Sequence, residues 1–420
     1  MIATIPFKTA FKEIDDIGVI WVLDEAIKLG FYNGNPDWAN LGQGEPEVGA
    51  LKGAPARIKE FTIAPDDDRY GPLNGIAELR KAIADYYNRL YRKNKISKYT
   101  ADNVSIAMGG RLALTRIFTI LGTIRVGYKV PEYPAYHDML NYQLDHITPI
   151  CIPTKKETHH SIPIDEFAKA IKKYGLDAFL FSNPCNPTGH VIHGEELSKY
   201  VKIARNENCA LVIDEFYSHF IYEHGKPAAS PVSSAEFIDD INAETVLIVD
   251  GLTKSFRYPG WRLAWALGPE KIISDLGRAA SALDGGPSVP IQRAAIQLFE
   301  PERTDLETHA LREVFSRKQN ITFNALRESG MSCSADANST FYVWADISQL
   351  PSPLNNSDDF FKEALKQKVI TVPGHLFDIH PGMEKKNSDF NHHVRFSFGP
   401  EEENLKMGLE RIAALIQSHR

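Results

Sequence analysis

The chain has 420 residues, 43% of them hydrophobic and 24% charged, with a formal net charge of −7 at pH 7. This length exceeds one ordinary hydrophobic core and predicts two domains of a globular protein. The acidic balance disfavours nucleic acid and anionic membrane surfaces as main partners, and no stretch approaches eighteen consecutive apolar residues, so no membrane span is expected.

The cysteines and the N-terminus predict a cytoplasmic protein. The four cysteines are far apart and show neither metal-ligand nor redox spacing: Cys151, Cys185, Cys209 and Cys333. Reduced thiols of this kind are normal in the cytosol. Acidic residues interrupt the apolar N-terminal residues that a signal core would need: Glu13, Asp15 and Asp16. We expect no metal site, and we interpret the histidine pairs 159–160 and 392–393 as solvated.

The first part of the chain is predicted to form an arm, a helix and a strand-helix pair. Residues 1–50 are expected to be an N-terminal arm with one amphipathic helix, which joins the smaller domain. Apolar residues recur at helical spacing over 76–93. A short apolar run at 104–108 predicts a strand, and Gly109 and Gly110 separate it from a helical pattern over 112–121.

Short apolar runs alternate with helical patterns through the middle of the chain. Further strands are predicted over 178–181, 209–213, 245–249 and 263–267, and a helix over 194–206. Continuous apolar strands separated by helices indicate a mostly parallel sheet that is covered on both faces. Such sheets bind ligands beyond the carboxyl ends of their strands, so four strand ends are expected to meet at one pocket. We assign residues 51–290 to this large domain.

The pattern changes from about Gln292 onward. The sequence predicts a long helical stretch to Arg327, followed by strands and helices at 341–344, 358–368, 369–374, 393–399 and 401–417. We therefore expect residues 291–420 to form a smaller α+β domain with its own sheet.

Two loops of the large domain carry chemistry. Lys254 follows the strand at 245–249, and Arg262 comes eight residues later. A lysine can form a Schiff base with a carbonyl-bearing cofactor, and a guanidinium can bind a phosphate on it. In the loop Ser182-Asn-Pro-Cys-Asn-Pro-Thr-Gly189, two prolines restrict the backbone around Asn186. A rigid turn of this kind suits orientation of a phenolic or hydroxyl oxygen.

Together these motifs resemble the class I/II aminotransferases, fold-type I enzymes that depend on pyridoxal 5′-phosphate. The resemblance extends from roughly Gly42 to Arg395. It implies an α/β fold, with a large, mostly parallel sheet covered by helices plus a smaller α+β domain. It also implies a homodimer that transfers an amino group from an L-amino acid to a 2-oxo acid by ping-pong chemistry at Lys254.

The resemblance implies three catalytic residues and a set of cofactor contacts. Lys254 would carry the cofactor and shuttle the proton, and Asp214 would pair with the pyridine nitrogen. Tyr217 and Asn186 would bind the ring 3′-oxygen. The phosphate would be held by Arg262 and by the helix N-terminus behind Gly109. The remaining implied cofactor-binding residues are Gly110, Arg111, Thr253, Tyr133, which would stack on the ring, and Tyr70, which would reach the phosphate of the neighbouring subunit.

The same resemblance implies the substrate contacts, and Asn186 is one of them. Arg395 would bind the α-carboxylate through two parallel hydrogen bonds, with a structural salt bridge as the alternative. The backbone of Gly44 would reach the same carboxylate. Phe377 would form an aromatic wall of the pocket or, as the alternative, part of the core.

Two departures from the family pattern bear on the substrate. Gly251 stands where the family often has a phosphate-binding serine. The segment 281–288 offers Asp284 and no arginine that could bind an acidic side chain. Because the segment offers no arginine, we hypothesise that an acidic side chain is not the favoured amino donor. If Asp284 faces the pocket, it would suit a basic or hydroxylated donor. The alternative is that Asp284 caps the turn at Gly285 and Gly286.

Three other functions stay open at this point. The same cofactor ligands also serve lyases, oxidases and cyclases that act on amino acids, because function lies in the grafted site rather than in the fold. The chain could also be a regulator that keeps the fold without catalysis, although no basic DNA-binding extension is seen. A cofactor-free binding protein is disfavoured by the four strand-end motifs.

Overall fold

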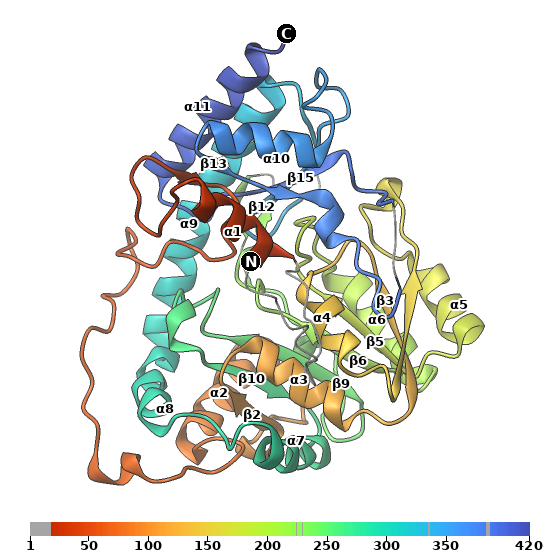
Figure 1. The fold of residues 1–420 in the computed structure, drawn as a ribbon. Coiled ribbons are helices and arrows are strands. Elements are labelled where there is room, and N and C mark those ends of the chain that lie inside the picture. Colours follow the sequence, from red (N-terminus) through yellow and green to blue (C-terminus); the bar gives the residue numbers. More distant parts are fainter. Residues whose placement is uncertain (1–17, 224, 229, 335–336, 384–386) are drawn as a thin grey trace, which may run out of the picture.

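The computed structural model describes residues 18–223, 225–228, 230–334, 337–383 and 387–420. Two sheets organise the chain, a large one in the lower part of Figure 1 and a small one above it. The N-terminal acidic residues Glu13, Asp15 and Asp16 lie outside the described residues. Within the described part, no helix is long and apolar enough to cross a membrane.

The large sheet has seven strands, and six of them run parallel. In spatial order they are β2 (Val104–Ala107), β10 (Ala264–Leu267), β9 (Val246–Gly251), β6 (Ala210–Asp214), β5 (Ala178–Ser182), β3 (Ile124–Lys129) and β4 (Ile147–Ile152). Only β10 is antiparallel to its neighbours. The parallel strands place their carboxyl ends at one edge, where the site lies.

Helices cover both faces of the large sheet, which explains its continuous apolar strands. In β5 and β6, Leu180 and Val212 face one hydrophobic cluster, while Phe179 and Leu211 face the other. The first cluster includes residues of α3 (Gly110–Ile120), α4 (Ala135–Asn141) and α7 (Glu270–Leu283). The second includes residues of α2 (Ala77–Tyr91), α5 (Ile164–Tyr174), α6 (Gly194–Asn206) and α8 (Val289–Ile296).

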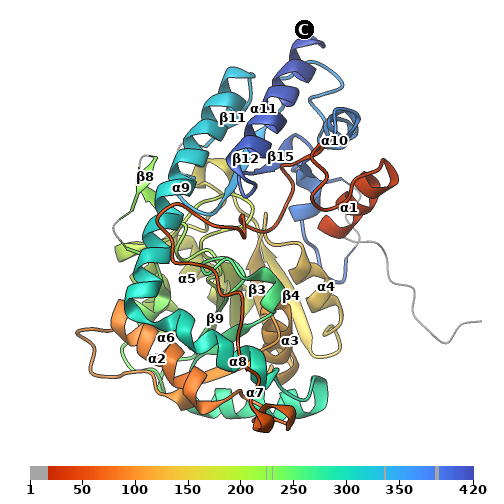
Figure 2. The ribbon, with the colours of Figure 1, turned by 90° about the vertical axis from the view of Figure 1, so that its left-hand side faces the viewer.

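The small sheet is antiparallel and holds the other half of the site. Its order is β11 (Ser332–Cys333), β12 (Tyr342–Asp346), β15 (His393–Ser397) and β14 (Val372–Pro373). The helices of this part are α9 (Pro301–Glu328), α10 (Ser357–Lys366) and α11 (Glu402–Gln417). Figure 2 shows α9 and α11 along their length and α10 nearly end on. The N-terminal helix α1 (Val19–Lys28) lies beside them, and β1 (Ala39–Asn40) pairs with β13 (Val369–Ile370).

The predicted fold class is confirmed, and the differences are local. The helix expected over 76–93 spans 77–91, and the helix expected over 194–206 has those bounds. The helical stretch expected over 292–327 is divided, because α8 ends before Pro301 and α9 begins there. The sequence missed β3 and β4. The domain boundaries near residues 50 and 290 stay a prediction.

A buried arginine attaches the N-terminal arm to both parts of the fold. Arg257 is fully buried, and its Nε donates to Glu307 of α9 at 2.6 Å. Its Nη1 donates to the carbonyls of Glu47 at 3.0 Å and Gly49 at 2.9 Å. One guanidinium therefore fixes the arm just after the residues that enter the site.

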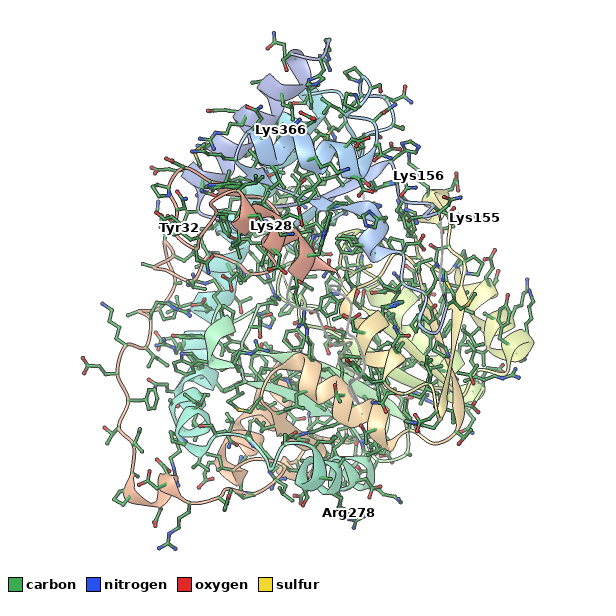
Figure 3. The ribbon with its side chains drawn as sticks, viewed as in Figure 1. Lys28, Tyr32, Lys155, Lys156, Arg278 and Lys366 are labelled. Atoms are coloured by element: carbon green, nitrogen blue, oxygen red, sulfur yellow. The ribbon has the colours of Figure 1, made fainter. Side chains whose placement is uncertain are left out.

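We predict that Arg257→Met lowers the free energy of unfolding by about 3 kcal/mol, because it leaves a buried carboxylate short of a cation. The measurement is the urea midpoint. The matched control is Arg278→Met, since Arg278 has a 78% exposed side chain and projects from the surface in Figure 3. Its pair with Asp275 should contribute less than about 1 kcal/mol. Equal losses in the two variants would contradict the prediction.

Candidate active site

The candidate residues follow neighbouring strands at one edge of the large sheet. Asp214 ends β6, Ser182 ends β5, and Lys254 lies three residues beyond the end of β9. Gly109 follows β2, which has the same direction as β9 because both are antiparallel to β10. The strand ends therefore meet as the sequence predicts.

Lys254 projects into this edge with a lowered basicity. Its ammonium donates to the carbonyl of Gly44, and Nζ lies 5.8 Å from the ring centroid of Tyr217. Burial lowers the pKa of Lys254 to about 8; the nearby Glu45 raises it and the Arg395 guanidinium lowers it further. A substantial fraction of the amine is therefore neutral near physiological pH.

Asp214 is a buried carboxylate without a cationic partner among the described residues. It is 7% exposed, and it accepts hydrogen bonds from the Tyr136 hydroxyl at 3.0 Å and from the Phe216 amide at 3.3 Å. Burial raises the pKa of Asp214 to about 6, and the two hydrogen bonds oppose that rise. Sequence reasoning missed Tyr136; its only signal was its place three residues after Tyr133, at the start of α4.

Arg395 is the opposite case, a buried cation without an anionic partner among the described residues. It is 1% exposed, its Nη1 donates to Asn186 Oδ1 at 2.9 Å, and its Nη2 donates to the Gly42 carbonyl at 3.0 Å. The guanidinium lies over the rings of Tyr342, at 4.1 Å, and Phe377, at 5.0 Å. In the described part of the chain no carboxylate pairs with it, and Nε has no hydrogen-bond partner. The salt-bridge alternative therefore loses its support.

Two phenols lie together between the lysine and this arginine. The hydroxyls of Tyr217 and Tyr342 are 2.9 Å apart, and burial raises the pKa of both. Tyr342 begins β12 and was predicted only as part of a strand. Because it comes from the small sheet, its contact with Tyr217 could not be read from spacing along the sequence.

Three glycines line the proposed phosphate end: Gly109, Gly110 and Gly251. Gly109 has a φ of +101°, and a Cβ there would collide with the Arg262 guanidinium. A Cβ on Gly110 would lie 2.5 Å from the Phe216 ring. One on Gly251 would lie 2.8 Å from the Leu263 carbonyl oxygen and 2.9 Å from both the Ala264 Cβ and the Phe216 ring, so these groups together exclude a serine at position 251. The N-terminus of α3 and Arg262 are left facing this end.

The other cofactor candidates lie around the same edge or at the surface. The Tyr133 hydroxyl accepts a hydrogen bond from Arg111 Nε at 3.2 Å, at the mouth of the site. Thr253 is partly buried beside Lys254. Tyr70 is fully exposed, so it does not contact the active site of its own chain.

Asp284 does not face the pocket. Both of its oxygens accept hydrogen bonds from Arg116, at 2.8 and 2.6 Å, and one also accepts the Gly286 amide at 2.8 Å. Arg116 in turn is 1% exposed and donates to the Ile106 carbonyl. This corrects the hypothesis of a substrate-binding Asp284 and favours the turn-capping alternative. The reasoning for a basic or hydroxylated donor falls with it.

The interpretation of the histidine pairs as solvated holds for His392, which is exposed, and needs correction for His160 and His393. His160 is 9% exposed, and burial lowers its pKa to about 3. His393 stacks on Trp344 at 5.1 Å between ring centroids, and burial lowers its pKa to about 4. Among the residues that the structure describes, no group of three or more His, Cys, Asp or Glu could hold a metal ion.

The edge of the large sheet thus brings together a lysine of lowered pKa, a buried carboxylate and a buried guanidinium. Residues 36–412 match the model of the family described as aminotransferase class I and II, and the chain belongs to this family. It is an aminotransferase, and enzymes of this family and fold depend on pyridoxal phosphate.

Curated relatives agree over almost the whole chain. The aspartate aminotransferase of Pyrococcus abyssi is 25% identical over 92% of this chain and 94% of its own length. The probable aspartate/prephenate aminotransferase of Thermus aquaticus is 27% identical over 91% and 92%. The structure of the Thermus thermophilus aspartate aminotransferase with maleate is 23% identical, with a TM-score of 0.77 over 96% of this chain and 97% of that one. These likenesses confirm fold type I.

We predict that Asp214→Asn raises the free energy of unfolding of the cofactor-free protein at pH 7 by about 3 kcal/mol. This is the free energy that corresponds to a folded-state pKa roughly two units above the ordinary value of an aspartate. The folded pKa lies above the unfolded one, so wild type loses this stability as pH rises from about 4 through 6. The gain of the variant should therefore vanish towards pH 4. The measurement is the urea midpoint of both proteins across this range.

Asp284→Asn serves as a control of opposite sign. Burial raises the pKa of Asp284, but the hydrogen bond from Arg116 and the Gly286 amide outweigh this and lower it. Its carboxylate therefore stabilises the fold above its unfolded pKa, and the variant should lose stability at pH 7. A stability difference for Asp214→Asn that does not change with pH would contradict the assigned cause.

Proposed function

We propose that this aminotransferase binds pyridoxal 5′-phosphate at Lys254 and moves an amino group from an L-amino acid to a 2-oxo acid in two half-reactions. The observation that carries the proposal is one arrangement. Asp214 lacks a cation, Arg395 lacks a carboxylate among the described residues, and both flank a lysine whose pKa is about 8. A cofactor with a protonated ring nitrogen and a substrate with an α-carboxylate supply the two missing charges.

The residues present fit the cofactor. Asp214 would pair with the ring nitrogen, and Lys254 would hold the cofactor covalently. Arg262 and the N-terminus of α3 would hold the phosphate, because helix N-termini favour anions. Tyr217 and Asn186 would bind the ring oxygen, and Tyr133 would cover the ring face. When bound, the cofactor supplies an electron sink for charge at the substrate α-carbon.

The chain itself supplies binding, orientation and proton transfer. Arg395 would bind the α-carboxylate, since its guanidinium is already held by Asn186 and the Gly42 carbonyl. The Lys254 amine, with a pKa near 8, can take and return a proton at neutral pH. The names of the relatives make aspartate the first amino donor to test.

We also propose a homodimer whose active sites are shared. The segment before α2 runs outside the body of the chain at the lower left of Figure 1. It exposes large apolar side chains: Phe61 at 40%, Ile63 at 56% and Tyr70 at 100%. Exposed apolar side chains on one segment favour burial by another chain. Tyr70 would then reach the phosphate held by the partner.

A reducing compartment suits the proposed enzyme. Among the described residues, the four cysteines at 151, 185, 209 and 333 form no disulfide. Burial raises the pKa of Cys209 and Cys333 to about 12. Both therefore stay protonated near neutral pH and resist oxidation, which proceeds through the thiolate. We therefore keep the cytoplasm as the proposed location.

We predict that Lys254→Ala lowers turnover by about 10⁴-fold, since it removes the group that moves the proton. The measurement is the visible spectrum of the loaded enzyme, without oxygen, as single amino acids are added. In wild type one donor should remove the absorbance band and a 2-oxo acid should restore it. Lys155→Ala, at an exposed lysine labelled in Figure 3, should behave as wild type. Ammonia release without any acceptor would instead assign a lyase or oxidase.

We predict that two impaired variants restore each other by subunit exchange. Tyr70→Ala should keep Lys254 but lose the partner contact, and Lys254→Ala should keep Tyr70. A mixed dimer then contains one intact site. After mild unfolding and joint refolding, activity should exceed the sum of the separately treated variants. Additive activity would contradict a shared site, and a monomer in sedimentation would contradict the dimer.

A further inference from the structure

A buried ion pair lies directly behind the proposed site, on residues that the functional assignment does not use. Glu132 is fully buried, and Lys129 Nζ lies 2.9 Å from its Oε1, with the two side chains 0% and 5% exposed. A buried pair of this kind adds little net stability over an apolar one, because both charges lose their hydration. Its retention is better explained by the geometry that it fixes.

Glu132 fixes the loop that carries Asn186. Ser182 Oγ donates to Glu132 Oε2 at 2.6 Å, and the Ser182 amide donates to Oε1 at 3.2 Å. The same Ser182 Oγ accepts the Asn186 amide at 3.2 Å. The Asn186 side chain then accepts from Arg395 at 2.9 Å. A series of hydrogen bonds between 2.6 and 3.2 Å long therefore links Glu132, through Ser182 and Asn186, to the Arg395 guanidinium.

The backbone of Glu132 also holds the other side of this guanidinium. Its amide donates to the Phe377 carbonyl at 3.1 Å, and the Phe377 ring lies 5.0 Å below Arg395. Glu132 thus touches the supports of Arg395 on two sides without touching Arg395 itself. Tyr133, the expected ring-stacking residue, follows it directly, and the Tyr133 amide donates to Glu132 Oε2 at 3.3 Å.

We propose that Glu132, acting through Ser182, is a positioning residue that aligns Asn186 and Arg395 for the substrate carboxylate. The Lys129 ammonium, 2.9 Å from Glu132 Oε1, supplies the counter-charge beside the oxygens that accept the Ser182 hydrogen bonds. The inference rests on the proposed function, because it assigns Arg395 to the substrate. It predicts a defect in substrate binding rather than in proton transfer at Lys254.

The test is Ser182→Ala, which breaks the series without leaving a buried charge unpaired. Weaker alignment in both half-reactions should raise KM for the amino donor and for the 2-oxo acid about tenfold, or roughly 1.4 kcal/mol, with kcat within about threefold. The control is Ser234→Ala. Ser234 is equally buried and donates to another buried glutamate, Glu215, also at 2.6 Å, but it packs against α2 and α6 on the far face of the sheet.

The control should lose similar stability and leave both KM values unchanged. Equal KM values for Ser182→Ala and wild type would overturn the positioning role, as would an equal rise in KM for Ser234→Ala. A wild type that shows no donor-dependent spectral change would overturn the proposed function as well. The two failures are therefore distinguishable.

A second pair of variants tests Glu132 without an unpaired charge. Lys129→Met with Glu132→Gln keeps an acceptor oxygen for Ser182, whereas Lys129→Met with Glu132→Leu keeps none. The double variant with Glu132→Gln should keep KM within about threefold of wild type, because the amide oxygen still accepts from Ser182. The double variant with Glu132→Leu should show the same rise in KM as Ser182→Ala. Equal KM values for these two double variants would overturn the assignment to Glu132.

Discussion

The buried guanidinium of Arg395 is the interaction on which the arrangement of the site depends. Its strand belongs to the small sheet, its Nη1 donor reaches Asn186 in the loop after β5, and its Nη2 donor reaches Gly42 in the N-terminal arm. Three segments far apart in the chain thus share one cation. A buried charge without a counter-ion is costly, and in the proposed function the substrate carboxylate would supply that counter-ion.

Asp214 has the complementary imbalance at the other end of the site. It is a buried carboxylate held by neutral donors, and burial raises its pKa to about 6. Neither charge is an error of packing, since each would be satisfied when a ring cation and a substrate carboxylate bind. Stability is lower in the empty protein for this reason, a common cost of a prepared site. Lys254 lies between the two and is tuned by both.

The sequence predicted what depends on local pattern and missed what depends on distant contacts. Lys254 and Asp214 could be proposed as site residues because each ends or follows an apolar run and because the surrounding motifs resemble the family. The strands β3 and β4 were missed because Arg125, Gly127 and Pro149 interrupt their apolar runs. Tyr342 and Glu132 gave no signal, since their partners lie 125 and 50 residues away. The hypothesis that Asp284 faces the pocket was wrong for the same reason, since its partner Arg116 is 168 residues away.

Packing from two directions excludes a serine at position 251. A Cβ there would lie 2.8 Å from the Leu263 carbonyl oxygen and 2.9 Å from both the Ala264 Cβ and the Phe216 ring. The neighbouring segment 263–264 and Phe216 therefore account together for the glycine. A Cβ on Gly110 would meet the same ring at 2.5 Å. In the proposed function, the backbone amides of the α3 N-terminus and Arg262, which lies against Gly109, would bind the phosphate in place of that serine.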